Sequence, residues 1–169
     1  MILFRVQKKA VLLTLLIDFK NGNLTSKLAF MDLKIGDKAP LFEAVRQDGQ
    51  IMKLKDMKGK KIILYFYPKD NTPTCTVQAC NLRDNYELIQ KEGYIVWGIS
   101  GDEAKSHQKF IEKHELPFDL LVDSDKKVHN LYGTWGEKVM FGKRYMGTKR
   151  TTFVIDEKGI ISQIIKKVK

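Results

Sequence analysis

Residues 61–80 read KIILYFYPKDNTPTCTVQAC, and this stretch decides the fold. Residues 61–67 are almost continuously apolar, which predicts a strand that is covered on both faces of its sheet. Pro68 ends this strand. Thr72 then offers an N-cap hydroxyl, and Pro73 suits the first position of a helix. The stretch therefore predicts a buried strand that leads into a helix.

The chain beyond this junction continues to alternate between strands and helices. One face of the first helix is built to pack on a sheet, because four apolar residues recur at helical spacing: Ala79, Leu82, Tyr86 and Ile89. Gly93 closes that helix. Further elements are expected as a buried strand at 94–100, a helix at 102–114, a short strand at 120–122 and a short helix at 126–132.

Two β-hairpins flank this alternating core. Residues 42–46 and 51–54 surround the turn sequence QDGQ, and Asp-Gly between short apolar runs is a strong hairpin signal. Near the end of the chain, residues 151–155 and 160–165 are strands joined by DEKG. We therefore predict one α/β domain over residues 31–169, with a mixed central sheet and helices on both of its faces.

The composition excludes several classes of protein. The chain has 169 residues, 43% of them hydrophobic and 30% charged, as expected of one globular domain. Its net charge is +10, but 25 basic and 19 acidic residues are mixed throughout residues 31–169. A nucleic-acid-binding protein more often carries a concentrated basic stripe, so no specific nucleic-acid partner is predicted.

Residues 1–30 are interpreted separately from the domain. They contain an apolar run at residues 10–17 after three basic residues, which has the outline of a secretory signal, although charged residues follow at once. Eight apolar residues are also far fewer than the roughly 20 that span a bilayer, so no membrane span is expected. Three interpretations stay open: a weak export signal, a surface-lying amphipathic segment, or a translation start assigned too far upstream of Met31.

Metal chemistry is not favoured by the cysteine and histidine pattern. Two cysteines are too few for a disulfide-stapled scaffold or for a structural zinc site without histidine ligands. His107, His114 and His129 lie far from both cysteines in the sequence and are interpreted as surface or half-buried residues. No metal is predicted.

Cys75 occupies the position with the most chemical meaning. If Thr72 is the N-cap, Cys75 is the third residue of the helix, where unpaired backbone N–H groups favour a thiolate over a thiol. Activation of the thiol alone gives only a few-fold in rate, because nucleophilicity falls as the thiolate becomes more stable. A fast thiol enzyme also needs a donor for the leaving oxygen, either a nearby hydroxyl such as that of Thr72 or an arginine from elsewhere in the chain.

Cys80 lies five residues further along the same predicted helix. At that spacing the two residues are about 7.5 Å apart along the axis and about 140° apart around it, so a disulfide cannot bridge them. A bond between Cys75 and Cys80 would require the first turns of the helix to unwind. Two alternatives therefore remain from the residues alone: an inert pair of thiols, or a redox couple with a local unfolding step.

The sequence resembles the peroxiredoxins of the bacterioferritin-comigratory, or Q, type. Pro68-x-x-x-Thr72-x-x-Cys75 matches the active-site motif of that family, and Cys80 matches the Q type. Four further segments fit it over nearly the whole domain: IGDKAP at 35–40, NLRD at 81–84, LPFDLLVD at 116–123 and RTTFVID at 150–156. The resemblance implies a thioredoxin-like fold and a thiol peroxidase that needs no cofactor.

The resemblance also implies a role for each site residue. Cys75 would attack the peroxide and become a sulfenic acid, and Cys80 would resolve it as an intramolecular disulfide that thioredoxin or a similar dithiol protein reduces. Thr72 and Arg150 would supply the hydroxyl and the guanidinium around the sulfur, while Pro68 would shield the pocket from water. Arg150 would reach the sulfur because it opens a strand that is expected to lie beside the strand at 61–67. The alternative function is a redox-sensing thiol switch without efficient peroxide turnover.

Some features depart from the family pattern. Thr74 replaces the usual glycine, Gln78 stands where glutamate is common, and the chain stops at Lys169, where a final helix usually follows. We expect an altered rate from the first two changes and a lower stability or more association from the third. The resemblance implies a monomer, and the two cysteines imply the dithiol-rich cytoplasm, unless residues 1–30 direct export.

Overall fold

The computed structural model describes residues 32–166. The interpretations of residues 1–30 and of the chain end after Lys166 lie outside the described residues. The main sheet contains seven strands: β1 (Glu43–Arg46), β2 (Ile51–Lys53), β3 (Lys61–Phe66), β4 (Tyr94–Ser100), β5 (Asp119–Val122), β8 (Thr151–Ile155) and β9 (Ile161–Ile165). The helices are η1 (Leu54–Met57), α1 (Pro73–Asp84), α2 (Tyr86–Lys91), α3 (Ala104–His114) and α4 (Lys127–Leu131).

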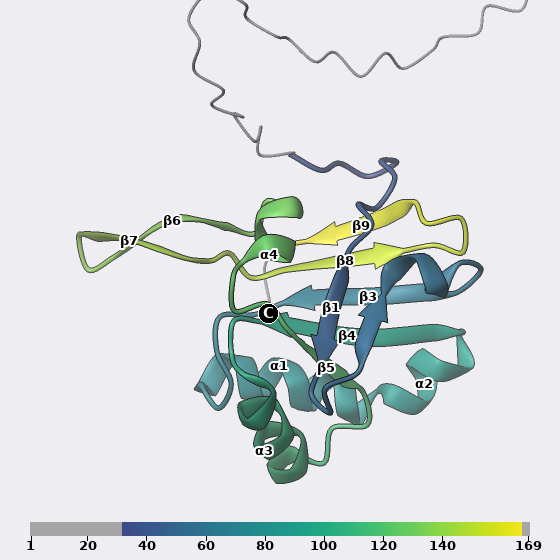
Figure 1. The fold of residues 1–169 in the computed structure, drawn as a ribbon, viewed down its shortest axis with the longest axis horizontal. Helices are drawn as coiled ribbons and strands as arrows, with labels where there is room; N and C mark the ends of the chain where they lie inside the picture. Colours follow the sequence, from purple (N-terminus) through teal and green to yellow (C-terminus); the bar gives the residue numbers. More distant parts are fainter. Residues whose placement is uncertain (1–31, 167–169) are drawn as a thin grey trace, which may run out of the picture.

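The seven strands form a mixed sheet in the order β2-β1-β5-β4-β3-β8-β9 (Figure 1). The three central strands β5, β4 and β3 run parallel, and β1, β8 and β9 are added antiparallel on the two sides. The predicted α/β class with a mixed sheet is thus confirmed. Both predicted hairpins are present, as β1–β2 and as β8–β9.

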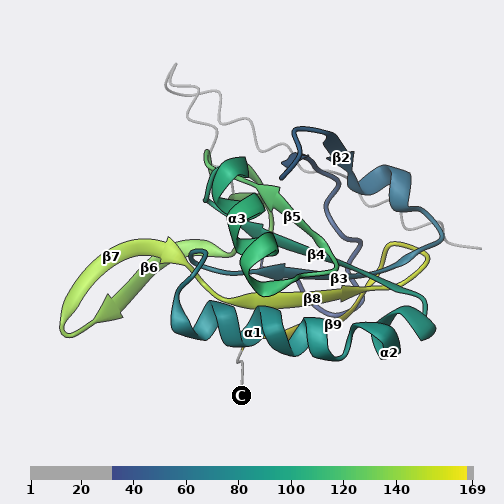
Figure 2. The same ribbon diagram turned by 90° about the horizontal axis from the view of Figure 1, so that it is seen from below.

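The core has two layers, because alternate side chains of each strand point to opposite faces. Tyr65, Val96 and Leu120 face α1, α2 and α3, which lie together on one side of the sheet (Figure 2). Leu64 and Trp97, with their neighbours on the same face, point to the other side of the sheet. There they pack against α4, η1 and the segment before β3. The predicted helical face of α1–α2 packs on the sheet through four residues: Ala79, Leu82, Tyr86 and Ile89.

Three local features differ from the sequence-based expectation. The helix expected to run to Gly93 is two helices, because Asn85 leaves the helical backbone region at φ −103° and ψ 9°. Its side-chain amide donates to the Asn81 carbonyl at 2.8 Å. A further hairpin, β6 (Trp135–Met140) and β7 (Lys143–Thr148), was not predicted and projects from the body of the protein (Figure 1).

The third difference concerns the histidines. His107 and His129 are completely buried, and each contacts an aspartate through its Nδ1 atom, at 2.9 Å from Asp70 and at 2.5 Å from Asp123. The interpretation as surface or half-buried residues is wrong for these two. The carboxylates provide the buried partners that allow a polar ring to enter the core.

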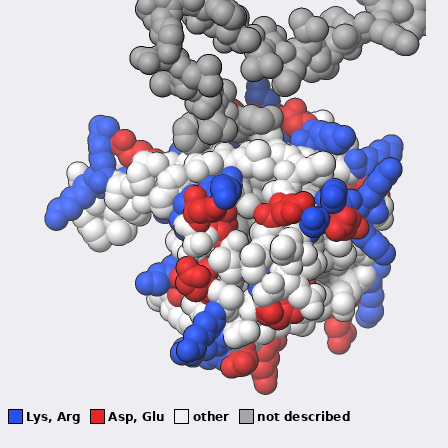
Figure 3. Space-filling view, in the orientation of Figure 1, with Lys and Arg blue, Asp and Glu red and all other residues white. Residues whose placement is uncertain are grey.

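The surface carries charges of both signs. On the face seen in Figure 3, basic and acidic side chains are interspersed, and several basic ones lie on the β6–β7 hairpin. Across residues 32–166, none of the helices has both the length and the apolar character needed to cross a membrane.

Candidate active site

The site lies where β3 ends and α1 begins, on the side of the sheet that α1, α2 and α3 cover. Thr72 is the N-cap of α1 with an extended backbone (φ −84°, ψ 148°), and Pro73 is the first helical residue, as predicted. The hydroxyl of Thr72 does not cap the helix but donates to the Lys69 carbonyl at 3.1 Å. The cap position is therefore confirmed, whereas the capping hydrogen bond expected from the hydroxyl is not formed.

Cys75 lies in the first turn of α1 and is 2% exposed. Its neighbours are the apolar residues of the core layer under α1, which include Tyr65 and Tyr67. The Nη2 group of Arg150 donates a hydrogen bond to the Cys75 sulfur at 3.2 Å. The sulfur is thus enclosed by apolar groups but faces one cation and the positive end of the helix.

Arg150 reaches the sulfur because of the sheet order. It immediately precedes β8, and β8 pairs antiparallel with β3, so that Thr151 lies opposite Phe66 at the end of the junction strand. The prediction that the arginine opens a strand beside residues 61–67 is confirmed. The sheet brings together two residues that are 75 positions apart in the sequence.

Gln78 holds the guanidinium in its orientation. Its side-chain oxygen accepts a hydrogen bond from Arg150 Nη1 at 2.5 Å, and its amide donates to the Thr152 hydroxyl at 3.5 Å. Gln78 lies one helical turn after Cys75 and is buried. The sequence analysis noted this residue only as a departure from glutamate, and its helical spacing from Cys75 was the signal for its position.

The remaining two predicted site residues lie near this group without a hydrogen bond to it. Cys80 is half-buried in the same helix as Cys75, and both cysteines are free thiols. Pro68 is exposed and follows β3 after one intervening residue, Tyr67. The unbroken helix between the cysteines agrees with the argument that they cannot pair in this arrangement.

A buried polar group, which the sequence analysis missed, supports the loop before α1. Asp70 accepts hydrogen bonds from the hydroxyls of Tyr67 and Ser106, both at 2.7 Å, and contacts His107. Burial by itself raises the pKa of the Asp70 carboxyl, but these partners, led by His107, outweigh it and hold the pKa below its usual value. Burial also raises the pKa of Tyr67 well above its usual value, so its hydroxyl stays neutral and donates.

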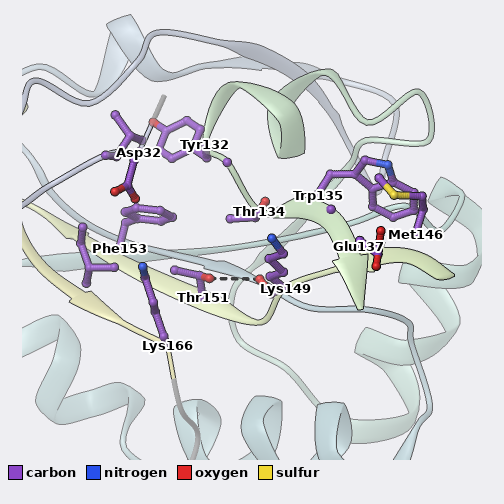
Figure 4. Close-up of a pocket in the computed structure, with 14 residues that line it drawn as sticks. Asp32, Tyr132, Thr134, Trp135, Glu137, Met146, Lys149, Thr151, Phe153 and Lys166 are labelled. Carbon is purple, nitrogen blue, oxygen red and sulfur yellow. Dashed lines mark hydrogen bonds between the residues drawn. The ribbon is translucent and has the colours of Figure 1, made fainter. Parts of the chain in front are cut away.

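Two hollows lie near the site without including Cys75. One, of about 300 Å³, is bordered by Pro68 and Lys69 of the loop and by Tyr145 and Thr148 of the β6–β7 hairpin. The other, of about 380 Å³, lies on the opposite face of β8, against Tyr132 and aromatic and charged neighbours (Figure 4). In Figure 4 the dashed line marks the hydrogen bond from the Thr151 hydroxyl to the Lys149 carbonyl, at 3.0 Å.

This second hollow lies on the face of β8 that points away from the Cys75 sulfur. Thr151 and Phe153 point into the hollow, whereas Thr152 between them points toward α1 and Gln78. Among residues 32–166, no group of three or more His, Cys, Asp or Glu side chains could hold a metal ion. The described site brings the Cys75 sulfur and the Arg150 guanidinium into contact.

Known proteins resemble this chain over almost the whole described region. The model of the AhpC/TSA family matches residues 35–164. A putative peroxiredoxin Bcp of Coxiella burnetii is 50% identical over 139 residues, which cover 82% of this chain and 92% of that protein. The peroxiredoxin Bcp of Bacillus subtilis is 47% identical over 139 residues, which cover 82% and 88%. The solved structure of Xanthomonas campestris peroxiredoxin Q matches with a TM-score of 0.71 and 32% identity, and the match covers 76% of this chain and 81% of that one.

Proposed function

The chain belongs to the AhpC/TSA family and within it to the Bcp-type peroxiredoxins, so it is a thiol peroxidase, and we propose that Cys75 is the nucleophile that attacks the peroxide. The hydrogen bond from Arg150 to the Cys75 sulfur is the single observation that supports this assignment best. Relatives named as peroxiredoxins do not favour the alternative of a redox-sensing switch without turnover.

The first chemical step uses the group around Cys75. The thiolate attacks one peroxide oxygen, the O–O bond breaks, and the departing oxygen takes a proton and leaves as water or an alcohol, so that Cys75 becomes a sulfenic acid. The Arg150 guanidinium has two donor nitrogens at the site, one on the sulfur and one held by Gln78. As charge moves from sulfur to oxygen, a fixed cation at this place stabilises the oxygen that departs.

Thr72 and Pro68 complete the proposed pocket. The Thr72 hydroxyl lies at the start of α1 and gives its hydrogen to Lys69, so its oxygen lone pairs are free to accept a hydrogen bond from the peroxide. Pro68 stands at the mouth of the junction, where its ring excludes water from one side of the loop. Both roles are proposed on the match of these positions to the motif.

The second step forms a disulfide between Cys75 and Cys80. The Cys80 thiolate attacks the sulfenic sulfur, hydroxide leaves and becomes water, and the first turns of α1 must unwind because the helix separates the two residues. A thiol reductant then supplies two electrons. We propose thioredoxin or a similar dithiol protein as this reductant, a monomeric peroxidase domain over residues 31–169, and the cytoplasm as its compartment.

The test compares two cysteine variants in a peroxide-consumption assay with thioredoxin and its reductase. Cys75→Ser should abolish turnover. Cys80→Ser should consume one equivalent of peroxide and then stop, because its sulfenic acid has no resolving thiol. A Cys75→Ser variant as fast as wild type would overturn the assignment of the nucleophile, and continued turnover of Cys80→Ser would overturn that of the resolving thiol.

A further inference from the structure

A buried aspartate–histidine pair lies beneath the loop that precedes α1. The Asp70 side chain is 2% exposed and that of His107 is completely buried, and Nδ1 of the ring lies 2.9 Å from the carboxylate. The hydroxyls of Tyr67 and Ser106 donate to the same carboxylate at 2.7 Å. The proposed chemistry at Cys75 uses none of these groups, although their loop carries Thr72.

The ring of His107 is held between two elements. Its Nδ1 lies 2.9 Å from the Asp70 carboxylate, and its Nε2 lies 3.3 Å from the Leu121 carbonyl of β5. The Tyr67 hydroxyl donates to Asp70, and its oxygen lies 3.4 Å from Nδ1. The buried ring therefore joins the Asp70 carboxylate to the sheet.

The contact between Asp70 and His107 ties the loop to α3. Asp70 belongs to the loop, whereas Ser106 and His107 belong to the first turn of α3. A second tie reinforces it, because the backbone N–H of Asp70 donates to the Asp102 carboxylate at 2.8 Å. Both contacts are made by Asp70, which precedes Cys75 in the chain. Asp70 therefore lies at the edge of the segment that must rearrange when Cys75 and Cys80 pair.

We propose that His107, acting through Asp70, is a positioning residue that holds the loop and the first turn of α1 in the peroxide-reactive arrangement and so slows their unwinding during disulfide formation. This inference rests on the proposed function of Cys75 and Cys80. A buried pair that loses one partner leaves an uncompensated charge, so its loss should loosen the loop selectively. The expected result is a faster resolving step with little change in the peroxide step.

The experiment uses the full chain in single-turnover mixing with one equivalent of peroxide, followed by acid quench and mass measurement of sulfenic acid and disulfide. His107→Asn should raise the rate of disulfide formation about tenfold and change the rate of sulfenic acid formation less than about threefold. Ser106→Ala removes only one hydrogen bond to Asp70, so it keeps the test usable if His107→Asn folds poorly. It should raise the same rate about threefold.

His129→Asn is the matched control, because it removes the other buried histidine–aspartate contact, on the opposite side of the sheet. The aspartate of that contact, Asp123, also accepts from the backbone N–H groups of Val128 and His129 in α4. His129→Asn should lower the melting temperature without raising the rate of disulfide formation. The inference is overturned if His107→Asn and Ser106→Ala resolve at the wild-type rate, or if His129→Asn accelerates the step equally. A wild-type protein that forms no Cys75–Cys80 disulfide would instead overturn the proposed function.

Discussion

Arg150 divides its two terminal nitrogens between a sulfur and an amide oxygen, and this division sets its orientation. One nitrogen donates to Cys75 and the other to Gln78. A lysine could place one charge near the sulfur, but it lacks the planar fork that serves both partners at once. The geometry of the candidate site therefore depends on the shape of the guanidinium as well as on its charge.

Replacement of Arg150 should show this dependence directly. Arg150→Ala removes the donor on the sulfur and should slow sulfenic acid formation by about 10²–10³-fold, as expected for one lost donor to a developing oxyanion. Stopped-flow measurement of the first peroxide equivalent gives this rate. Arg144→Ala is the matched control, because Arg144 is an exposed hairpin arginine paired with Glu137 at 3.1 Å, and it should leave the rate unchanged. A loss below about threefold for Arg150→Ala would contradict the assigned role.

The Asp70 carboxyl should make the free energy of unfolding depend on pH in the acid range. Its folded-state pKa is lowered, so it contributes stability above its ordinary value of about 3.9, and this contribution is lost as the pH falls through the lowered pKa. Urea unfolding between pH 3 and pH 7 should show a weaker pH dependence for Asp70→Asn than for wild type. Equal slopes for the two proteins would contradict this expectation.

Asp48 provides the comparison at the surface. Its hydrogen bond with Arg46 lowers the pKa of Asp48 to about 2. Asp48 is nevertheless exposed, and water screens its pairing. Asp48→Asn should therefore change the acid dependence of unfolding less than Asp70→Asn does.

At the scale of single elements, hydrophobic pattern and turn chemistry predicted most of the structure. The run at residues 61–67 predicted β3 to within one residue, and the Pro73 signal predicted the start of α1, but α1 ends at Asp84 and not at Gly93. The β6–β7 hairpin was missed because its strands are mostly exposed and its turn is unusual. Phe141 and Gly142 both adopt positive φ, of 51° and 74°, and phenylalanine stands where asparagine or aspartate would have signalled this turn.

The interior of β4 tolerates no side chain at Gly98. A Cβ atom there would lie 2.6 Å from the Tyr65 ring and 2.6 Å from Leu120. The Tyr65 ring is buried and stacks on Tyr67 at 5.3 Å, so it has little room to move. Gly98→Ala should therefore lower the free energy of unfolding by about 1–3 kcal/mol, measured by urea denaturation.

Gly136→Ala in β6 is the matched control for Gly98→Ala. The atoms that its Cβ would meet belong to the far end of the Lys149 side chain, which is flexible and can move away. Gly136→Ala should lower the free energy of unfolding by much less than Gly98→Ala does. Equal costs for both substitutions would show that close contact in the core is not the cause.

At the scale of the whole molecule, the sequence predicted the type of sheet and one pair of neighbouring strands that are distant in the chain. It did not predict the complete strand order. The pairing of β8 with β3 followed from the expected position of Arg150. The pairing of β1 with β5 joins segments about 75 residues apart, and no predicted site residue connected them. It is supported by the Gln47 side chain, which donates to Asp119 at 2.9 Å and accepts from the Leu120 amide at 3.0 Å.

The same limit applies to the candidate site. Cys75 and Thr72 could be assigned from local sequence, because their positions follow from one helix start. The partners Gln78–Arg150 and Asp70–His107 could not, because each pair is separated by at least 37 residues and meets only through the sheet order. Buried histidines in particular carry no local pattern that distinguishes them from exposed ones.

The β6–β7 hairpin affects how concentrated solutions of the protein should behave. Within the described part of the chain each of its strands pairs only with the other, so both outer margins offer free backbone donors and acceptors to a neighbouring molecule. Its tip also exposes Val139, Met140 and Phe141. The nearby cations Lys143 and Arg144 repel their counterparts in another copy, and added electrolyte weakens that repulsion. Light scattering of a millimolar sample should therefore increase with sodium chloride, and Phe141→Lys should suppress the increase.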